Sequence, residues 1–218
     1  MIGPRFGFGL GGSSCRISTM VMCVLLVAPG SALAQKRGPA QTEHQTAVEF
    51  TRRIERWQKS NDPDEEIAAL EAALRLESQL RAWPQGLPLK GSRQRIKGIL
   101  QSALGNSYQQ RRKGSRADNL ETAIAAYEAA LTVFTRAVLP QEWATTQNNL
   151  GNAYQTRIRG ERTDNLEKAI AAFEAALTVF TREVLRRDWA DTQSNLANAY
   201  ANRIRGERRQ PGESNRSL

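Results

Sequence analysis

The strongest constraint on the fold of this chain is a pattern that returns every 46 residues. Trp143 recurs as Trp189, and residues 119–136 match residues 165–182 at 16 of 18 positions. Residues 104–108 are an earlier copy of part of the same unit. A period of about 20 to 50 residues is typical of arrays in which each unit buries its apolar side against the next one. We therefore expect stacked, similar units rather than one continuous core.

Each unit contains two amphipathic helical patterns. At helical periodicity, one face of the first helix collects the residues Trp143, Gln147, Leu150, Tyr154 and Ile158. The opposite face is polar and includes Thr145, Asn148, Asn149, Asn152, Gln155 and Thr156. Residues 165–180 form the second pattern, and between the two Gly160 can end one helix while Asp164 can cap the next. Dense groups of Ala and Leu also favour helix, so the chain is predicted to be all-α, built from antiparallel helix pairs.

The second half of the chain resembles the tetratricopeptide repeat (TPR) family. The resemblance rests on Leu150, Gly151 and Tyr154, followed by Ala169, Phe173 and Ala176. It implies a right-handed α-solenoid in which Leu and Tyr pack within a pair and Gly lets two helices come close. The period exceeds the roughly 34 residues usual in the family. The chain is therefore similar to the longer variants of bacterial multi-repeat proteins and, more loosely, of kinesin light chains. The resemblance is strong over residues 96–205 and weak over 44–95.

The repeat divides the chain into four predicted parts. They are a signal peptide (1–34), a degenerate helix pair with a Pro-rich insertion (35–95), TPR-like repeats ending in an unpaired helix (96–205), and a flexible tail (206–218). The last helix, near residues 189–204, has no partner after it. It can serve as a polar cap of the array, or dock on a partner or a second copy; a truncated gene is a further alternative.

The degenerate pair aligns with the later repeats at a different spacing. Residues 67–74 parallel residues 124–131 at a distance of 57 residues, and the surplus over 46 is assigned to an insertion around residues 83–88. The prolines of that segment cannot continue a helix. Asp62 is placed as a helix cap ahead of a first-turn proline. The preceding helix is expected near residues 46–59, with the packing residues Val48, Phe50, Ile54 and Trp57.

The first 34 residues have the pattern of a secretory signal peptide. Arg5 and Arg16 precede or flank an apolar run at residues 20–28, and small residues lead to a cleavage site after Ala34. The run is too short to span a bilayer, so no transmembrane anchor is expected after cleavage. Cleavage removes those two arginines, which lowers the formal charge from +9 to +7, and both cysteines. The protein is therefore predicted to be exported, periplasmic or secreted; an N-terminal anchor or a misplaced start is the alternative.

The sequence offers few groups for catalysis. His44 is the only histidine, and no cysteine or aspartate around it has metal-ligand spacing. No Gly-rich phosphate loop, nucleophile elbow or zinc-binding helix motif occurs. We therefore predict a protein that is not an enzyme and that uses neither a cofactor nor a metal.

Amide side chains on the first helix of each unit are candidates for binding. They are Asn106, Asn149, Asn152, Gln155, Asn195 and Asn198. In proteins of the resembled family this face lines a groove, where asparagines bond a peptide backbone whatever its side chains. Each amide offers both donors and an acceptor. The predicted partner is a protein or an extended peptide; alternatively, these amides bond neighbouring helices or are solvated.

A repeated basic loop is the second candidate for binding. Stacking would align its arginines into a basic ridge, formed by Arg111, Arg112, Arg157, Arg159, Arg203 and Arg205. Such a ridge could attract an acidic partner. The alternative is a solvated edge that Glu161, Asp164 and Glu207 partly neutralise. Predicted export and the lack of interleaved aromatic residues argue against nucleic acid.

Together these features predict a non-enzymatic scaffold or adaptor in the cell envelope that mediates protein–protein or peptide binding. One alternative is a structural module that forms a homo-oligomer through its last helix. The other is a regulatory fragment of a larger repeat-containing signalling or protease system.

Overall fold

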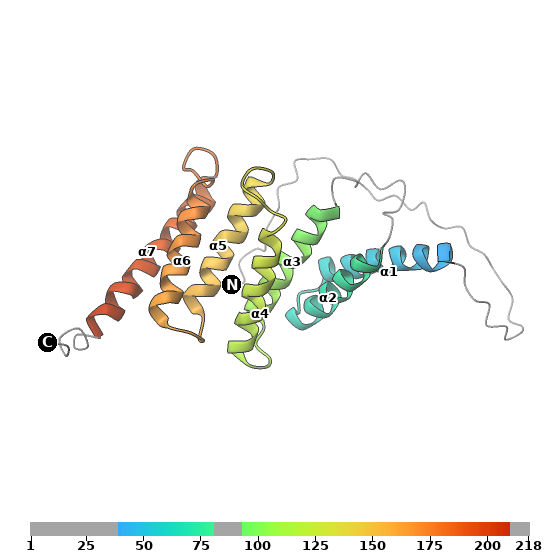
Figure 1. Ribbon diagram of the computed structural model, residues 1–218, viewed down its shortest axis with the longest axis horizontal. Helices are drawn as coiled ribbons and strands as arrows, with labels where there is room; N and C mark the ends of the chain where they lie inside the picture. The colour runs from blue at the N-terminus through green and yellow to red at the C-terminus, as the bar shows by residue number, and fades with distance from the viewer. Residues whose placement is uncertain (1–38, 81–92, 210–218) are drawn as a thin grey trace, which may run out of the picture. The chain divides into compact units, whose positions relative to one another are not determined.

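A computed structural model describes residues 39–80 and 93–209 of the chain (Figure 1). Within these ranges the chain forms seven helices and no strand, which confirms the all-α prediction. The helices are α1 (Pro39–Lys59), α2 (Pro63–Gln79), α3 (Arg93–Gln110), α4 (Arg116–Leu131), α5 (Pro140–Thr156), α6 (Arg162–Leu177) and α7 (Arg186–Arg209). Each of these helices is too short or too polar to cross a membrane. The predicted signal peptide and the Pro-rich segment 83–88 lie outside the described residues.

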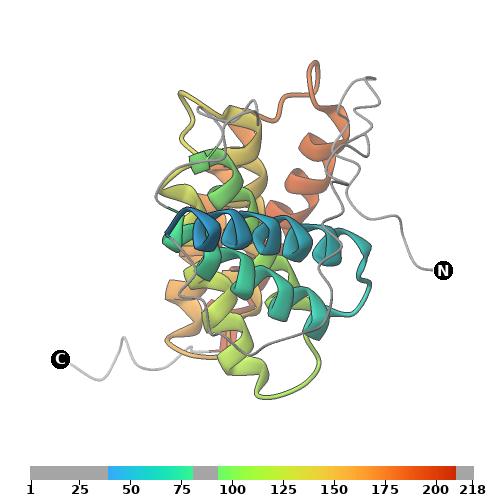
Figure 2. The ribbon, with the colours of Figure 1, turned by 90° about the vertical axis from the view of Figure 1, so that its right-hand side faces the viewer.

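Each helix packs against the next one along the chain, from α1 to α7 (Figure 1). Helices α3 and α4 run antiparallel, because Phe134, just after the end of α4, lies against Gly98 near the start of α3, whereas Tyr127 of α4 lies against Gly105 further along α3. Figure 2 shows α1 and α2 as another packed pair. Helix α5 also contacts α3 and α7, whereas α4 and α6, in the same part of the chain, do not contact each other. The helices thus form recurring antiparallel pairs, with α7 packed on α5 and α6.

Side-chain caps explain where two of the helices begin. Asp62 accepts a hydrogen bond from the backbone N–H of Asp64 at 3.0 Å, and Pro63 occupies the first turn of α2. This arrangement confirms the cap predicted from the sequence. Ser115 caps α4 in a similar way through the backbone N–H of Asp118.

The loop before α6 is held differently from the prediction. Gly160 has a φ of 75°, a conformation that glycine adopts without strain. Asp164 was expected to cap α6 but lies inside its first turn, so that prediction is wrong. The buried Asn165 ties the loop instead, because its Nδ2 donates to the backbone carbonyl of Arg159 at 2.8 Å. Asn119 ties the preceding loop in the same way at 2.9 Å.

The core of each later pair joins a glycine on one helix to an aromatic ring on the next. A Cβ atom added to Gly105 would lie 2.6 Å from the ring of Tyr127, and one added to Gly151 would lie 2.6 Å from the ring of Phe173. Both rings are fully buried. Because no side chain fits at that distance, glycine allows the close approach of the two helices, as the family resemblance implied.

Two residues expected in the core are more exposed than predicted. Ile158 lies beyond the end of α5 at Thr156, and its exposed fraction is 60%. In α1, Phe50 is buried as predicted, but Val48 is 37% exposed. Helix α7 also continues to Arg209, into the segment 206–218 that was expected to be a tail.

Hydrogen bonds confirm the alignment of the N-terminal pair with the later repeats. The hydroxyl of Tyr154 donates to Oε1 of Glu128 at 2.8 Å, and that of Tyr108 donates to Oε1 of Glu71 at 2.7 Å. Glu71 and Glu128 are 57 residues apart, which is the predicted spacing. Helix α2 therefore takes the place of α4 in the array, and the extra residues lie between Glu71 and Tyr108.

Candidate protein-binding face and the ties between repeats

The predicted amides lie on the three helices α3, α5 and α7, hereafter the first-helix row, in which α5 contacts both α3 and α7. Asn106 belongs to α3, Asn149, Asn152 and Gln155 belong to α5, and Asn195 and Asn198 belong to α7. The structure separates these six residues into amides bonded within the protein and amides that are open.

Asn106 and Asn149 are bonded within the protein. Asn149 was placed on the open polar face, but it is only 8% exposed, so that placement is wrong. Its Nδ2 donates to Oδ1 of Asn106 at 3.1 Å and thereby links α5 to α3. The hydroxyl of Tyr127 also donates to Oδ1 of Asn106, at 2.7 Å, and reaches Oε1 of Gln109 at 2.9 Å. Asn106 is thus held by two neighbouring helices at once.

Asn195 makes a similar link one repeat later. Its Nδ2 donates to Oδ1 of Asn148 at 3.2 Å, which joins α7 to α5. For Asn106, Asn149 and Asn195 the structure therefore shows the alternative reading, in which amides hold neighbouring helices together.

Three predicted binding residues remain open. Asn152 and Gln155 on α5 are half-buried, and Asn198 on α7 is exposed. Their side chains make no hydrogen bond to another residue of the described ranges. These amides therefore keep their donors and acceptors for an external group.

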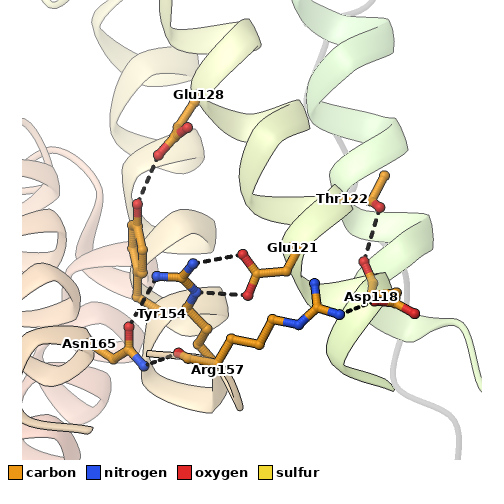
Figure 3. Close-up of polar contacts among 8 residues, drawn as sticks. Asp118, Glu121, Thr122, Glu128, Tyr154, Arg157 and Asn165 are labelled. Atoms are coloured by element: carbon orange, nitrogen blue, oxygen red, sulfur yellow. Dashed lines mark hydrogen bonds and ion pairs between the residues drawn. The ribbon is translucent and has the colours of Figure 1, made fainter. Parts of the chain in front are cut away.

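A cluster of polar contacts ties each first helix back to the helix before it (Figure 3). Directly after α5, the guanidinium of Arg157 donates from Nε and Nη2 to the two carboxylate oxygens of Glu121 on α4, at 2.8 and 2.7 Å. Arg157 also donates to Oδ1 of Asn165 at 3.3 Å. One turn earlier, Tyr154 bonds Glu128 of the same preceding helix. These contacts connect three consecutive helices at one point.

The same tie recurs along the array. In α7, Arg203 pairs with Glu167 at 3.0 Å and Tyr200 donates to Glu174 at 2.7 Å. Directly after α3, Arg111 pairs with Asp64 at 2.7 Å, next to the Tyr108–Glu71 bond. Each arginine also lies over the ring of the tyrosine three residues before it, with 5.1 to 5.8 Å to the ring centroid. An Arg and a Tyr on the first helix, facing two acids on the preceding helix, therefore form a standard joint of this protein.

The contacts of the joint shift the pKa values of its members. The hydrogen-bonded guanidinium of Arg157 lowers the pKa of Glu121, and the carboxylate in turn raises the pKa of Arg157. Burial, and then the bond to Glu128, raises the pKa of Tyr154 to about 12. At neutral pH the joint therefore holds an ionised pair beside a neutral phenol.

Most of the predicted basic ridge belongs to these ties. Arg111, Arg157, Arg159 and Arg203 each pair with an acid of the preceding helix. The acids are not the loop residues expected from the sequence, since Glu161 and Asp164 make no ion pair with another described residue. Arg112 and Arg205 are exposed and have no ion-pair partner among the described residues. The ridge is therefore largely neutralised.

The sequence analysis missed the acids of the joint. Glu121 and Glu128 lie two turns apart on one side of α4, and both recur 46 residues later in α6. Tyr154 and Arg157 recur in the same way in α7. The shared period of the four residues was the signal that could have paired them.

The described helices show no sign of a metal centre. No group of three or more His, Cys, Asp or Glu residues in these ranges could hold a metal ion, and His44 is exposed on α1.

The fold and its contacts define an all-helical protein made of recurring, packed helix pairs. No protein-family model, curated protein or solved structure matches this chain.

Proposed function

We propose that this protein is a TPR-like, non-enzymatic scaffold that holds an extended segment of a partner protein on the first-helix row. The observation that carries the proposal is the set of open amides, Asn152, Gln155 and Asn198. The main chain of an extended segment offers one donor and one acceptor per residue. Asn152 and Gln155 lie three positions apart on α5, so they face the same side and can bond one peptide group together.

The proposed architecture is a right-handed α-solenoid with long TPR-like units. It is supported by the 46-residue period, by the antiparallel pairs, and by the close contacts of Gly105 and Gly151 with aromatic rings. The basic ridge adds little to this proposal, because four of its six arginines are already paired within the chain.

Binding of an array of random dodecapeptides to the protein lacking residues 1–34 tests the scaffold function. The double variant Asn152→Ala/Asn198→Ala is expected to bind the selected peptides about tenfold more weakly or worse, because each lost hydrogen bond costs about 1 kcal/mol. Thr122→Ala, a polar-to-Ala change at an exposed position of α4, is the matched control and should bind as the wild type does. Equal binding by the double variant and the control would reject the first-helix row as the binding face.

We also propose that the protein acts after export, on the strength of residues 1–34. Mass spectrometry of the protein produced in a secreting bacterium is expected to find Gln35 at its N-terminus outside the cytoplasm. A full-length chain confined to the cytoplasm would contradict export.

Self-association through α7 is a second candidate function. Ala197 occupies the position of Gly105 and Gly151, but it is exposed, and no other described helix packs on that side of α7. Ile204 on α7 is 46% exposed. A second copy would cover these residues, so sedimentation should detect a dimer that Ile204→Glu disrupts. A monomer at high concentration would remove this candidate.

A further inference from the structure

Two consecutive repeats place the same ring in the same position but give it different polar neighbours. The Cε1 atoms of Tyr127 and Phe173 lie at 2.6 Å from the Cβ that Gly105 or Gly151 would carry, and the Cδ1 atoms at 2.8 Å in both cases. Tyr127 and Phe173 are 46 residues apart. The two rings are therefore equivalent, and they differ by one hydroxyl group.

In the earlier repeat that hydroxyl turns two amides inward. It lies 2.7 Å from Oδ1 of Asn106 and 2.9 Å from Oε1 of Gln109, while Tyr127 is fully buried. A buried hydroxyl needs a partner, so its single proton, shared between the two amide oxygens, holds them toward the ring. Asn149 adds a second bond to Asn106 and fixes it further.

In the later repeat the equivalent amides have neither of these partners. Asn152 and Gln155 follow Asn106 and Gln109 by 46 residues, but the ring below them belongs to Phe173, which has no polar atom. The hydrogen bond between repeats also differs. Asn195 is equivalent to Asn149, but it donates to Asn148 and not to Asn152, the equivalent of Asn106. The earlier repeat has Ser102 at the position of Asn148. Two separate sequence differences thus release the same amide, Asn152.

We propose that Phe173 determines where on the first-helix row the main chain of an extended peptide binds. A phenylalanine leaves the amides of Asn152 and Gln155 free to bond one peptide group of the partner, whereas Tyr127 closes the equivalent pair, Asn106 and Gln109. This inference rests on the proposed scaffold function and assigns its main contact to α5. Recognition through the main chain makes the partner an extended, unpaired segment that is not selected by charge.

The exchange of the two rings tests the inference without removing any amide. Phe173→Tyr adds the hydroxyl that closes the later pair, and Tyr127→Phe removes the one that closes the earlier pair. The probe is a triglycine blocked at both ends, which offers peptide groups and no side chains. The readout is the nuclear magnetic resonance shift of assigned Asn and Gln side-chain amides during titration. Each variant is first checked by circular dichroism for wild-type helical content and a cooperative unfolding transition above the assay temperature, and Tyr127 shows that a tyrosine fits this position.

In the wild type, the shifts are expected at Asn152 and Gln155 and not at Asn106 and Gln109. Phe173→Tyr should weaken the binding at the later pair about tenfold. Tyr127→Phe should create shifts at Gln109, whereas Asn106 stays bonded to Asn149. Wild-type shifts of equal size at both pairs, or binding that Phe173→Tyr leaves unchanged, would overturn the role of Phe173 while keeping the scaffold function. No shift at any amide of the row would overturn main-chain binding itself, and both proposals with it.

Discussion

The pairs α3–α4 and α5–α6 share their packing and differ in their open face. Both use a glycine against a buried ring, a buried asparagine of the second helix that bonds the connecting loop, and an Arg–acid tie to the helix before. They differ in the ring hydroxyl, which only Tyr127 has, and therefore in the hydrogen bonds of the nearby amides. The stacking contacts and the amides themselves therefore recur with the period, whereas the buried ring has changed from Tyr127 to Phe173. The two repeats thus carry the same amides with different hydrogen-bond partners.

The largest expected effect tests the shared part of this comparison. Gly151→Ala places a methyl group against the ring of Phe173, and overpacking of a core costs about 1–3 kcal/mol. This loss exceeds the roughly 1 kcal/mol that Ala gains over Gly in a helix. We expect a net decrease of up to about 2 kcal/mol in the free energy of unfolding, measured by urea denaturation followed by circular dichroism.

A second glycine provides the matched control for that variant. Gly206 lies in α7 with no atom within 4 Å of an added Cβ, so Gly206→Ala should leave stability unchanged or raise it by up to about 1 kcal/mol. Gly105→Ala, at the equivalent position against Tyr127, should lose as much as Gly151→Ala does. A Gly151→Ala protein more stable than the wild type would show that close helix approach is not the reason for this glycine.

The next effect tests the part in which the pairs differ. Tyr127→Phe removes a buried hydroxyl that bonds Asn106 and Gln109, and such a loss costs about 0.5–1.5 kcal/mol. Phe173→Tyr should instead keep or slightly raise stability, because Asn152 and Gln155 are placed to accept the new hydroxyl. Urea denaturation of both variants measures the difference between their two changes in the free energy of unfolding. Equal losses in the two would mean that the later amides do not reach the ring.

Periodicity allowed much of the fold to be predicted, because stacking requires the same residues in each unit. The helix pairs and the 57-residue alignment of the N-terminal pair followed from recurring positions. The role of Gly151 came from the family resemblance, and the cap at Asp62 from the proline that follows it. The prediction failed where a small rotation of a helix decides whether a side chain points outward or toward a neighbouring helix. Asn149 lies at the edge of the polar face, and a small rotation turns it toward α3 rather than outward.

The candidate site could be predicted only as a set of amides. Which of them are open depends on partners far away in the sequence, such as Tyr127 for Asn106. A single sequence shows that Tyr127 becomes Phe173, but it does not show that this ring lies beneath the amides. Likewise, the arginines of the ridge were recognised, whereas their pairing with Glu121 and Glu167 depends on how neighbouring helices are stacked.

The smallest expected effect compares two copies of the same ion pair. Arg157 and Glu121 form two hydrogen bonds and are 22% and 26% exposed, whereas Arg203 and Glu167 form one bond at 3.0 Å and are 33% and 51% exposed. Solvent screens the second pair more strongly, so a double-mutant cycle with Gln substitutions should give a larger coupling energy for the first. For Arg157–Glu121 we expect a value near the upper end of the range of about 0.2–1 kcal/mol that exposed pairs show.

The pH dependence of stability sharpens the same test. Arg157 lowers the pKa of Glu121 in the folded protein. Glu121 therefore contributes stability above its unfolded pKa, near the ordinary value of 4.5, and that contribution is lost as the pH falls from there through the lower folded value. Urea denaturation between neutral pH and pH of about 3 should show a smaller acid loss in Glu121→Gln than in the wild type. An identical acid loss in both proteins would show that the carboxylate of Glu121 is not bound to Arg157 in solution, and the joint between α4 and α5 would then rest on Tyr154 and Glu128 alone.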